Sequence, residues 1–273
     1  MSPVARTVVG SLGFSEPMAG RPRFYANNHA LDVLNVVRHP VSIEDLRYRE
    51  IPPSLDVEGF SIRPHRSSVR DFRDAGEVER VYKEEIRELL LAASGADHVI
   101  VTGTGILRFG ERSQESGAHN NSQPARFVHI DVSDATAAMF YARSRPDSGR
   151  RVRRSAQYNV WRVVSPPPQD VPLAVCDARS LSPDDLIAAD AIFDSHDAPE
   201  FSFEALLIRY NPRQRWAFFS NMRSDEALLF KTNDTDPGAA HNVPHGAFDD
   251  PNCPGDVPPR ASIEMRGIAY WFE

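Results

Sequence analysis

The strongest constraint on the fold is a succession of short β-prone segments from about residue 98 to the end of the chain. Turn-forming residues separate runs rich in Val, Ile, Phe, Tyr and Trp, namely 98–102, 126–130, 157–164, 205–210, 215–220, 227–231 and 262–272. This pattern predicts a mainly antiparallel β-core. The Asn211-Pro212 turn between two of the runs also predicts a hairpin.

The sequence before this region predicts one clear helix. Asp74 and Glu77 have the spacing of a capping box, apolar residues follow at helical intervals, and Gly95 ends the pattern. Residues 1–66 are punctuated by proline and predict an irregular arm that wraps the core and contains short extended pieces, such as 7–9 and 40–43. Ser182 and Pro183 predict a second, short helix, and the acidic residues after it predict a surface insertion.

A chain of 273 residues with 41% apolar content can form one substantial core. We therefore predict a single domain over 1–273, mainly β with flanking helices. Its parts are a wrapping N-terminal arm (1–66), helical support (67–95) and a core (96–273) with an acidic insertion near 182–200. Many short strands preceded by helix favour a double-stranded β-helix, the cupin-like jelly roll, for this core.

Composition limits the binding partners and the cellular compartment that can be expected. A net charge of -7 disfavours binding to a phosphate backbone, so no nucleic-acid partner is expected. No stretch reaches the ~18 apolar residues of a membrane helix, so no membrane partner is expected either. Two cysteines cannot form a disulfide framework, and we predict a cytoplasmic protein.

The residues that most strongly suggest chemistry are His129 and Asp131. On the predicted strand these two side chains project to the same face, while Ile130 points away. His245 lies just before the final strand and supplies a third candidate ligand. Two imidazoles and one carboxylate leave coordination positions open, as iron(II) requires to bind a keto acid and molecular oxygen.

Arg260 and Ser262 make this interpretation more specific. Their spacing after His245 lets one further strand turn both side chains toward the metal. A guanidinium fork and a hydroxyl suit the distal carboxylate of 2-oxoglutarate. By contrast, His241 lies beside Pro244 in a predicted loop, and His196 lies in the acidic insertion, so neither is expected to bind the metal.

Further motifs resemble those of the AsaB/CmcJ-type hydroxylase/desaturases, a family that includes a cephem methoxylase component and fungal natural-product oxygenases. The resemblance covers nearly the whole chain. The segments that carry it are 45–47, 55–60, 129–131, 159–162, 172–177, 225–231, 244–248 and 259–266.

The resemblance implies a jelly-roll oxygenase of secondary metabolism, dependent on iron(II), 2-oxoglutarate and molecular oxygen. His129, Asp131 and His245 match its catalytic iron ligands, and Arg260 matches the arginine that binds the co-substrate. Asn159 and Arg162 match a polar strand that is expected to face the pocket and to help bind the cofactor. The expected substrate is a small natural-product intermediate, to be hydroxylated, desaturated or cyclised, and a homodimer is compatible with the sequence.

Two alternatives stay open at this point. One is an iron oxygenase with the same triad that does not consume 2-oxoglutarate, for example one that forms an endoperoxide. The other is a noncatalytic accessory subunit of a biosynthetic oxygenase. The sequence does not identify the substrate.

Overall fold

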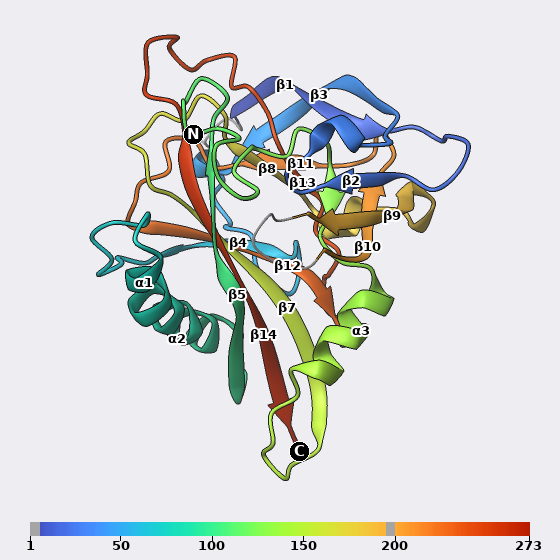
Figure 1. Ribbon diagram of the computed structural model, residues 1–273, viewed down its shortest axis with the longest axis vertical. Coiled ribbons are helices and arrows are strands. Elements are labelled where there is room, and N and C mark those ends of the chain that lie inside the picture. Colours follow the sequence, from blue (N-terminus) through green and yellow to red (C-terminus); the bar gives the residue numbers. More distant parts are fainter. Residues whose placement is uncertain (1–5, 195–199) are drawn as a thin grey trace.

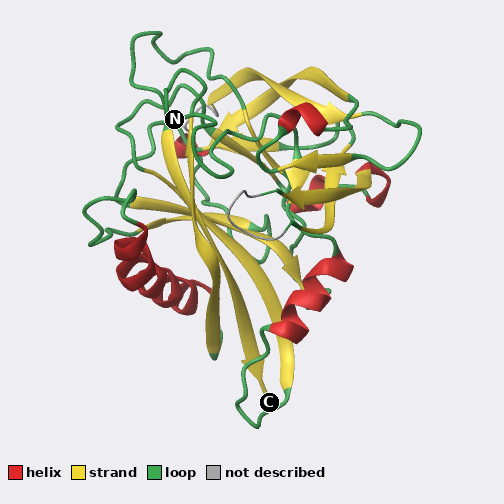
Figure 2. Cartoon of the chain, in the orientation of Figure 1, coloured by secondary structure: helices red, strands yellow, loops and turns green. Residues whose placement is uncertain are grey.

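Two β-sheets form the core of the computed structural model, which describes residues 6–194 and 200–273 (Figure 1). The first has nine strands in the order β1 (Arg6–Ser15), β3 (Val36–Asp45), β11 (Trp216–Phe218), β8 (Leu173–Cys176), β13 (His245–Ala247), β6 (His129–Ile130), β10 (Phe201–Ile208), β9 (Leu186–Phe193) and β2 (Arg23–Tyr25). The second has five, in the order β4 (Phe60–Pro64), β12 (Glu226–Asp234), β7 (Val152–Val163), β14 (Ala261–Phe272) and β5 (His98–Phe109). Strand clearly predominates over helix (Figure 2). The predicted mainly-β jelly roll is confirmed.

The five-stranded sheet has two different buried faces because side chains alternate along each strand. On one face, Trp161 and Phe230 pack against Val175 of the nine-stranded sheet, so this face looks into the space between the sheets. On the other face, Val160 and Met265 pack against the helical segment. We call these the inner and the outer face.

The predicted helix lies on the outer face. It consists of α1 (Ala75–Glu77), a π-helical turn (Val78–Tyr82) and α2 (Lys83–Ser94). The Asp74 carboxylate accepts hydrogen bonds from the first free amides, and Gly95 ends the helix at a φ of 66°. Helix and sheet approach closely at Gly267, where a Cβ atom would come within 2.5 Å of Leu90 Cδ1. The predicted start, end and amphipathic character are therefore confirmed.

The N-terminal region is more regular than the predicted arm, and the predicted extended pieces 7–9 and 40–43 lie within β1 and β3. β1 and β3 form a ladder that pairs Arg6 with Asp45 and Ser15 with Val36. β2 is part of the nine-stranded sheet, where it pairs with β9, and β4 is part of the five-stranded sheet, where it pairs with β12. Proline was the reason to expect irregular structure, yet Pro40 lies within β3. It is tolerated because β11 pairs with only the last residues of β3 and needs no N–H from Pro40.

The predicted acidic insertion is mostly a regular strand. β9 pairs with β10 along its whole length, from Leu186 opposite Ile208 to Phe193 opposite Phe201. Its acidic residue Asp190 is neutralised by Arg21, 2.7 Å away, which explains why charge did not exclude a strand. The expected short helix before it is one 3-10 turn, Pro183–Asp185. Residues 195–199, which include the predicted non-ligand His196, lie outside the described residues.

Two further differences concern connections. Ser133 caps a helix that the sequence analysis did not predict, α3 (Asp134–Arg143). A turn does occur at Asn211, but the predicted hairpin is wrong, because β10 pairs with β6 and β9 whereas β11 pairs with β3 and β8. Within the described residues, none of the helices combines the length and hydropathy needed to cross a bilayer.

Candidate active site

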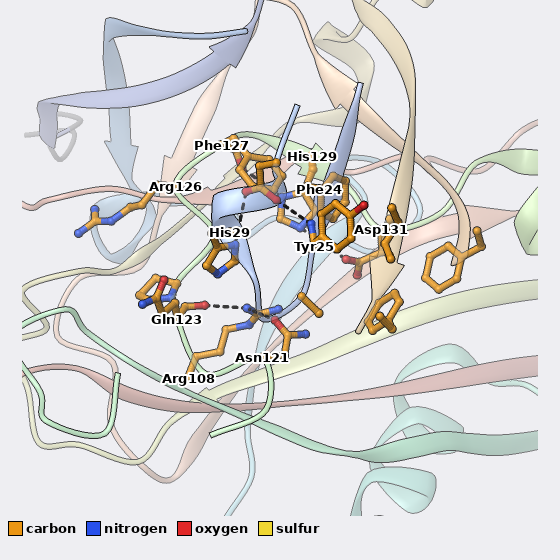
Figure 3. A pocket seen from close by; sticks show the side chains of 18 of the residues that line it. Phe24, Tyr25, His29, Arg108, Asn121, Gln123, Arg126, Phe127, His129 and Asp131 are labelled. Carbon is orange, nitrogen blue, oxygen red and sulfur yellow. Dashed lines mark hydrogen bonds and ion pairs between the residues drawn. The ribbon is translucent and has the colours of Figure 1, made fainter. Parts of the chain in front are cut away.

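His129, Asp131 and His245 converge between the two sheets. His129 on β6 lies directly opposite His245 on β13, which brings their ring centroids to 4.4 Å. Asp131 follows β6 and returns to the same face, as alternation predicts. One ligand atom from each of the three buried residues lies within 4.8 Å of the others. Figure 3 shows His129 and Asp131 at the wall of a cavity.

Backbone contacts orient both imidazoles. Nδ1 of His129 lies 3.1 Å from the Phe127 carbonyl oxygen, and Nδ1 of His245 lies 3.3 Å from that of Val243. With a proton on each Nδ1, both Nε2 lone pairs face the Asp131 carboxylate, at 3.5 and 4.0 Å from Oδ1. Burial, followed by repulsion from His129, lowers the pKa of His245 to about 3. At neutral pH this imidazole therefore carries no proton on the nitrogen that would bind a metal.

Asp131 is held by two polar side chains of the five-stranded sheet. Asn159 donates to Oδ2 at 2.5 Å, and the Arg266 guanidinium lies 3.2 Å from Oδ1. Burial alone would favour a neutral carboxyl, but the charge of Arg266 opposes it, and the pKa of Asp131 lies well below its usual range. Arg266 is braced in turn by Glu264, at 2.9 Å. The carboxylate is thus ionised and fixed in direction.

Arg266 and Glu264 were not predicted as site residues. Both occupy alternate positions on the strand that continues from Arg260 and Ser262, and β14 pairs with β7 in unbroken register from Ser262 to Trp271. Because every second side chain of a strand lies on the same face, both residues could have been predicted to share the face of Arg260 and Ser262. Asn159 was predicted to face the pocket; it is fully buried and contacts Asp131, which borders the smaller cavity.

Arg260 is a buried cation that lacks a partner for part of its side chain. It is 1% exposed, and its Nε and Nη2 atoms find no hydrogen-bond acceptor within residues 6–194 and 200–273. Burial, with repulsion from Arg108 and Arg126, lowers its pKa to about 9, which still leaves it protonated at neutral pH. Ser262 is equally buried, on the strand that follows it. A buried guanidinium in this state is costly unless a carboxylate binds it.

Arg162 does not face the pocket, in contrast to the prediction. It is three residues from Asn159 on β7, and an odd separation on a strand puts the two side chains on opposite faces. Its guanidinium lies on the outer face, 5.3 Å from the Tyr82 ring centroid and 5.9 Å from that of Phe72. Carbonyl oxygens of Ser224 and His65 accept its protons. Aromatic faces and carbonyls, rather than an anion, compensate its burial.

Two neighbouring cavities lie on this side of the triad, and the smaller one borders it. The smaller one, of about 240 Å³, is bordered by His129 and Asp131. The larger one, of about 900 Å³, is lined mainly by apolar side chains such as Phe109 and Phe140. Both are bordered by Asn121, Phe193, Phe203 and Arg266. The space beside the triad therefore suits a small organic molecule.

The remaining histidine of the 241–245 pair behaves as predicted. His241 lies in a loop, and its Nδ1 contacts the carbonyl oxygen of Ala239 at 3.2 Å. Among the described residues, it is not part of the cluster around His245.

The family model described as oxidoreductase/YMDC permease-like domain matches residues 12–270 of the chain. A hydroxylase/desaturase of Cercospora beticola is 33% identical over 249 residues, which cover 85% of this chain and 76% of the relative. An Fe(II)/2-oxoglutarate-dependent dioxygenase of Aspergillus novofumigatus is 29% identical over 243 residues, which cover 86% of this chain and 84% of the relative. The predicted resemblance to hydroxylase/desaturases is confirmed.

A solved structure of an iron and alpha-ketoglutarate-dependent endoperoxidase, NvfI, has the same fold. The TM-score is 0.80 at 24% sequence identity, and the match covers 98% of this chain and 99% of that one. This likeness independently supports the jelly-roll assignment.

Proposed function

The chain belongs to the oxidoreductase/YMDC permease-like family, together with fungal hydroxylase/desaturases, and from this premise we propose that it is an iron(II)- and 2-oxoglutarate-dependent oxygenase. Its substrate is a small natural-product intermediate, which it hydroxylates, desaturates or cyclises. The single domain spans residues 1–273.

The observation that carries this proposal is the pairing of a three-residue ligand set with an unsatisfied buried guanidinium. His129, Asp131 and His245 offer two imidazole nitrogens and one carboxylate oxygen within 4.8 Å. This donor set suits iron(II) and leaves room for other ligands. Arg260 supplies the positive charge that a dicarboxylate co-substrate needs at its far end.

The residues of the chain have separable tasks in this proposal. The triad holds the metal, Asn159 and Arg266 fix the direction of the Asp131 carboxylate, and Arg260 with Ser262 binds the distal carboxylate of 2-oxoglutarate. When bound, iron with 2-oxoglutarate supplies the oxidising chemistry that activates molecular oxygen. The walls of the two cavities hold the substrate carbon near the metal and exclude water.

Anaerobic titration of the metal-free protein with iron(II) and 2-oxoglutarate tests the proposal. Wild type is expected to develop the visible metal-to-ligand charge-transfer band. His245→Ala removes a ligand and abolishes the band, whereas Arg260→Ala requires far more 2-oxoglutarate to reach it. His241→Ala is the matched control, because it removes a histidine from the same loop without touching the triad, and it should titrate like wild type.

The other outcomes separate the alternatives. Iron binding without a charge-transfer band favours an iron oxygenase that does not consume 2-oxoglutarate. Absence of iron binding, with small-molecule binding retained, favours a noncatalytic accessory subunit. A cytoplasmic location and a homodimer stay predictions, for cell fractionation and light scattering to test.

A further inference from the structure

We propose that the substrate carries a carboxylate, or an equivalent anion, that Arg108 binds, and an apolar body that fills the larger cavity. This inference rests on the proposed function and narrows its substrate class. Arg108 comes from β5, where it lies opposite Ser262 of β14, and its side chain reaches into the smaller cavity (Figure 3). The sequence analysis did not assign it a role.

The first step of the argument is that Arg108 has no anionic partner in the part of the chain that the structure describes. Its Nη1 donates to the Asn121 side-chain oxygen at 2.9 Å and to the Gln123 carbonyl at 2.7 Å. Both acceptors are neutral, and they engage only one of its three nitrogens. Burial lowers the pKa of Arg108, which shows that its charge is poorly solvated. An approaching anion would relieve this cost.

The second step is that the other charged side chains of the smaller cavity already form pairs. These pairs are Glu111 with Arg126, Asp32 with His29, and Asp131 with Arg266, at 2.5, 3.4 and 3.2 Å. Arg108 is therefore the unmatched charge among the described residues of this wall.

The third step is that iron and 2-oxoglutarate would not use this charge. A divalent iron ion, the Asp131 carboxylate, the doubly charged co-substrate and Arg260 sum to zero. Arg266 keeps a carboxylate neighbour in Glu264 even when the metal occupies Asp131. The loaded site would therefore still have one excess positive charge at Arg108, close to where the substrate binds.

The larger cavity indicates the rest of the molecule. It meets the smaller one at Asn121, Phe193, Phe203 and Arg266, so a ligand can extend from Arg108 past the triad into it. Its apolar wall is made of Ile100, Leu107, Phe109, Phe140, Phe193, Phe203 and Ile268. At about 900 Å³ it holds a substantial apolar body. Anchoring one end at Arg108 would determine which carbon lies beside the metal.

Paired probes that differ in charge alone test the inference. A panel of arylacetic acids and medium-chain fatty acids is compared with the corresponding primary amides, by calorimetry on the anaerobic protein loaded with iron(II) and 2-oxoglutarate. Wild type should prefer at least some acids over their amides by about tenfold or more, as for a charge-assisted hydrogen bond. Arg108→Gln should bring the ratio close to one, and Arg108→Lys should retain part of it.

Arg73→Gln is the matched control, because Arg73 lines the larger cavity but is paired with Glu115 at 2.6 Å. It should keep the wild-type preference for acids. The inference is overturned if no acid binds better than its amide, or if the preference survives Arg108→Gln.

A separate titration distinguishes this inference from the proposed function. Arg108→Gln should bind iron(II) and 2-oxoglutarate as wild type does, and its melting temperature should show that it is folded. A loss of 2-oxoglutarate affinity as large as that of Arg260→Gln would assign Arg108 to the co-substrate and overturn the inference. If wild type binds neither iron nor 2-oxoglutarate, the proposed function fails. The anion site at Arg108 can then still be tested, because the ratio of acid to amide affinity can be measured on the unloaded wild type and Arg108→Gln.

Discussion

Arg260 and Arg162 are both fully buried, both were expected to bind the cofactor, and they have opposite surroundings. Arg260 lies at the inner face, with two nitrogens that have no acceptor among the described residues and with the Trp161 ring centroid 5.7 Å away. Arg162 lies at the outer face, against Tyr82 and Phe72 and with carbonyl acceptors. The first guanidinium has two nitrogens without an acceptor among the described residues, whereas the second is part of the packing between helix and sheet.

The difference shows that burial of a charge does not identify a binding residue. The two differ in the face of the sheet that they occupy and in their hydrogen bonds: carbonyl oxygens accept from both terminal nitrogens of Arg162, and only its Nε has no partner among the described residues, whereas Nε and Nη2 of Arg260 both lack one. The five-stranded sheet therefore separates function from stability: substitutions on its inner face should change binding, and those on its outer face should change folding.

The largest expected effect on stability is that of Arg162→Gln. The substitution removes contacts with two aromatic rings and charge-assisted hydrogen bonds to carbonyls, which should lower the free energy of unfolding by about 3 kcal/mol. Arg260→Gln, the matched inner-face change, should stay within about 1 kcal/mol of wild type or raise stability, because it removes a buried charge without an anion. Urea unfolding of the metal-free proteins measures both. Equal losses of unfolding free energy in the two variants would contradict the proposed division between the two faces.

The same two variants should reverse their order when 2-oxoglutarate binding is measured. Arg260→Gln loses a bidentate, desolvated charge pair and should weaken binding about a hundredfold. Arg162→Gln should bind 2-oxoglutarate as wild type does once it is folded. Calorimetric titration of the manganese(II)-loaded proteins gives the dissociation constants, and a large loss in Arg162→Gln with intact metal binding would contradict its outer-face placement.

The fold was predictable where local patterns and tertiary structure agree. Asp74 and Gly95 define the helix through capping chemistry, and alternating apolar residues define β14. The full length of the β1–β3 ladder and the strand β9 were not predicted, because proline and acidic residues lower strand propensity. Pairing with a distant strand and neutralisation by Arg21 outweigh that propensity, and neither is visible in a local window.

The candidate site was predictable where its residues alternate along a strand, because every second side chain lies on the same face. His129 and Asp131 share a face for that reason, and Arg266 could have been added by the same rule. The error on Arg162 came from grouping it with Asn159, although positions three apart on a strand point in opposite directions. Arg108 could not have been identified from sequence, since its role depends on which carboxylates are already paired.

A smaller effect is expected from Asn159→Ala, which tests the inner face at the metal. Loss of the amide that orients the Asp131 carboxylate should weaken metal affinity by about tenfold. Val160→Ala, the next residue and on the outer face, should lower stability but leave metal affinity unchanged. Competition with a fluorescent chelator measures manganese(II) affinity in both. An unchanged affinity in Asn159→Ala would remove the supporting role of this hydrogen bond.

The smallest effect concerns Tyr82, the outer-face neighbour of Arg162, and is confined to alkaline pH. Burial raises the pKa of Tyr82 to about 12, although Arg162 acts in the opposite direction. A group whose pKa is raised on folding stabilises the protein fully below its unfolded pKa of about 10 and loses that contribution as pH rises through 12. Tyr82→Phe should therefore lose about 1 kcal/mol less stability than wild type between pH ~9 and ~11. Urea unfolding at the two pH values measures the difference. Equal losses of stability in wild type and Tyr82→Phe would show that Tyr82 ionises as readily in the folded protein as in the unfolded chain. That result would contradict the tight aromatic packing around Arg162.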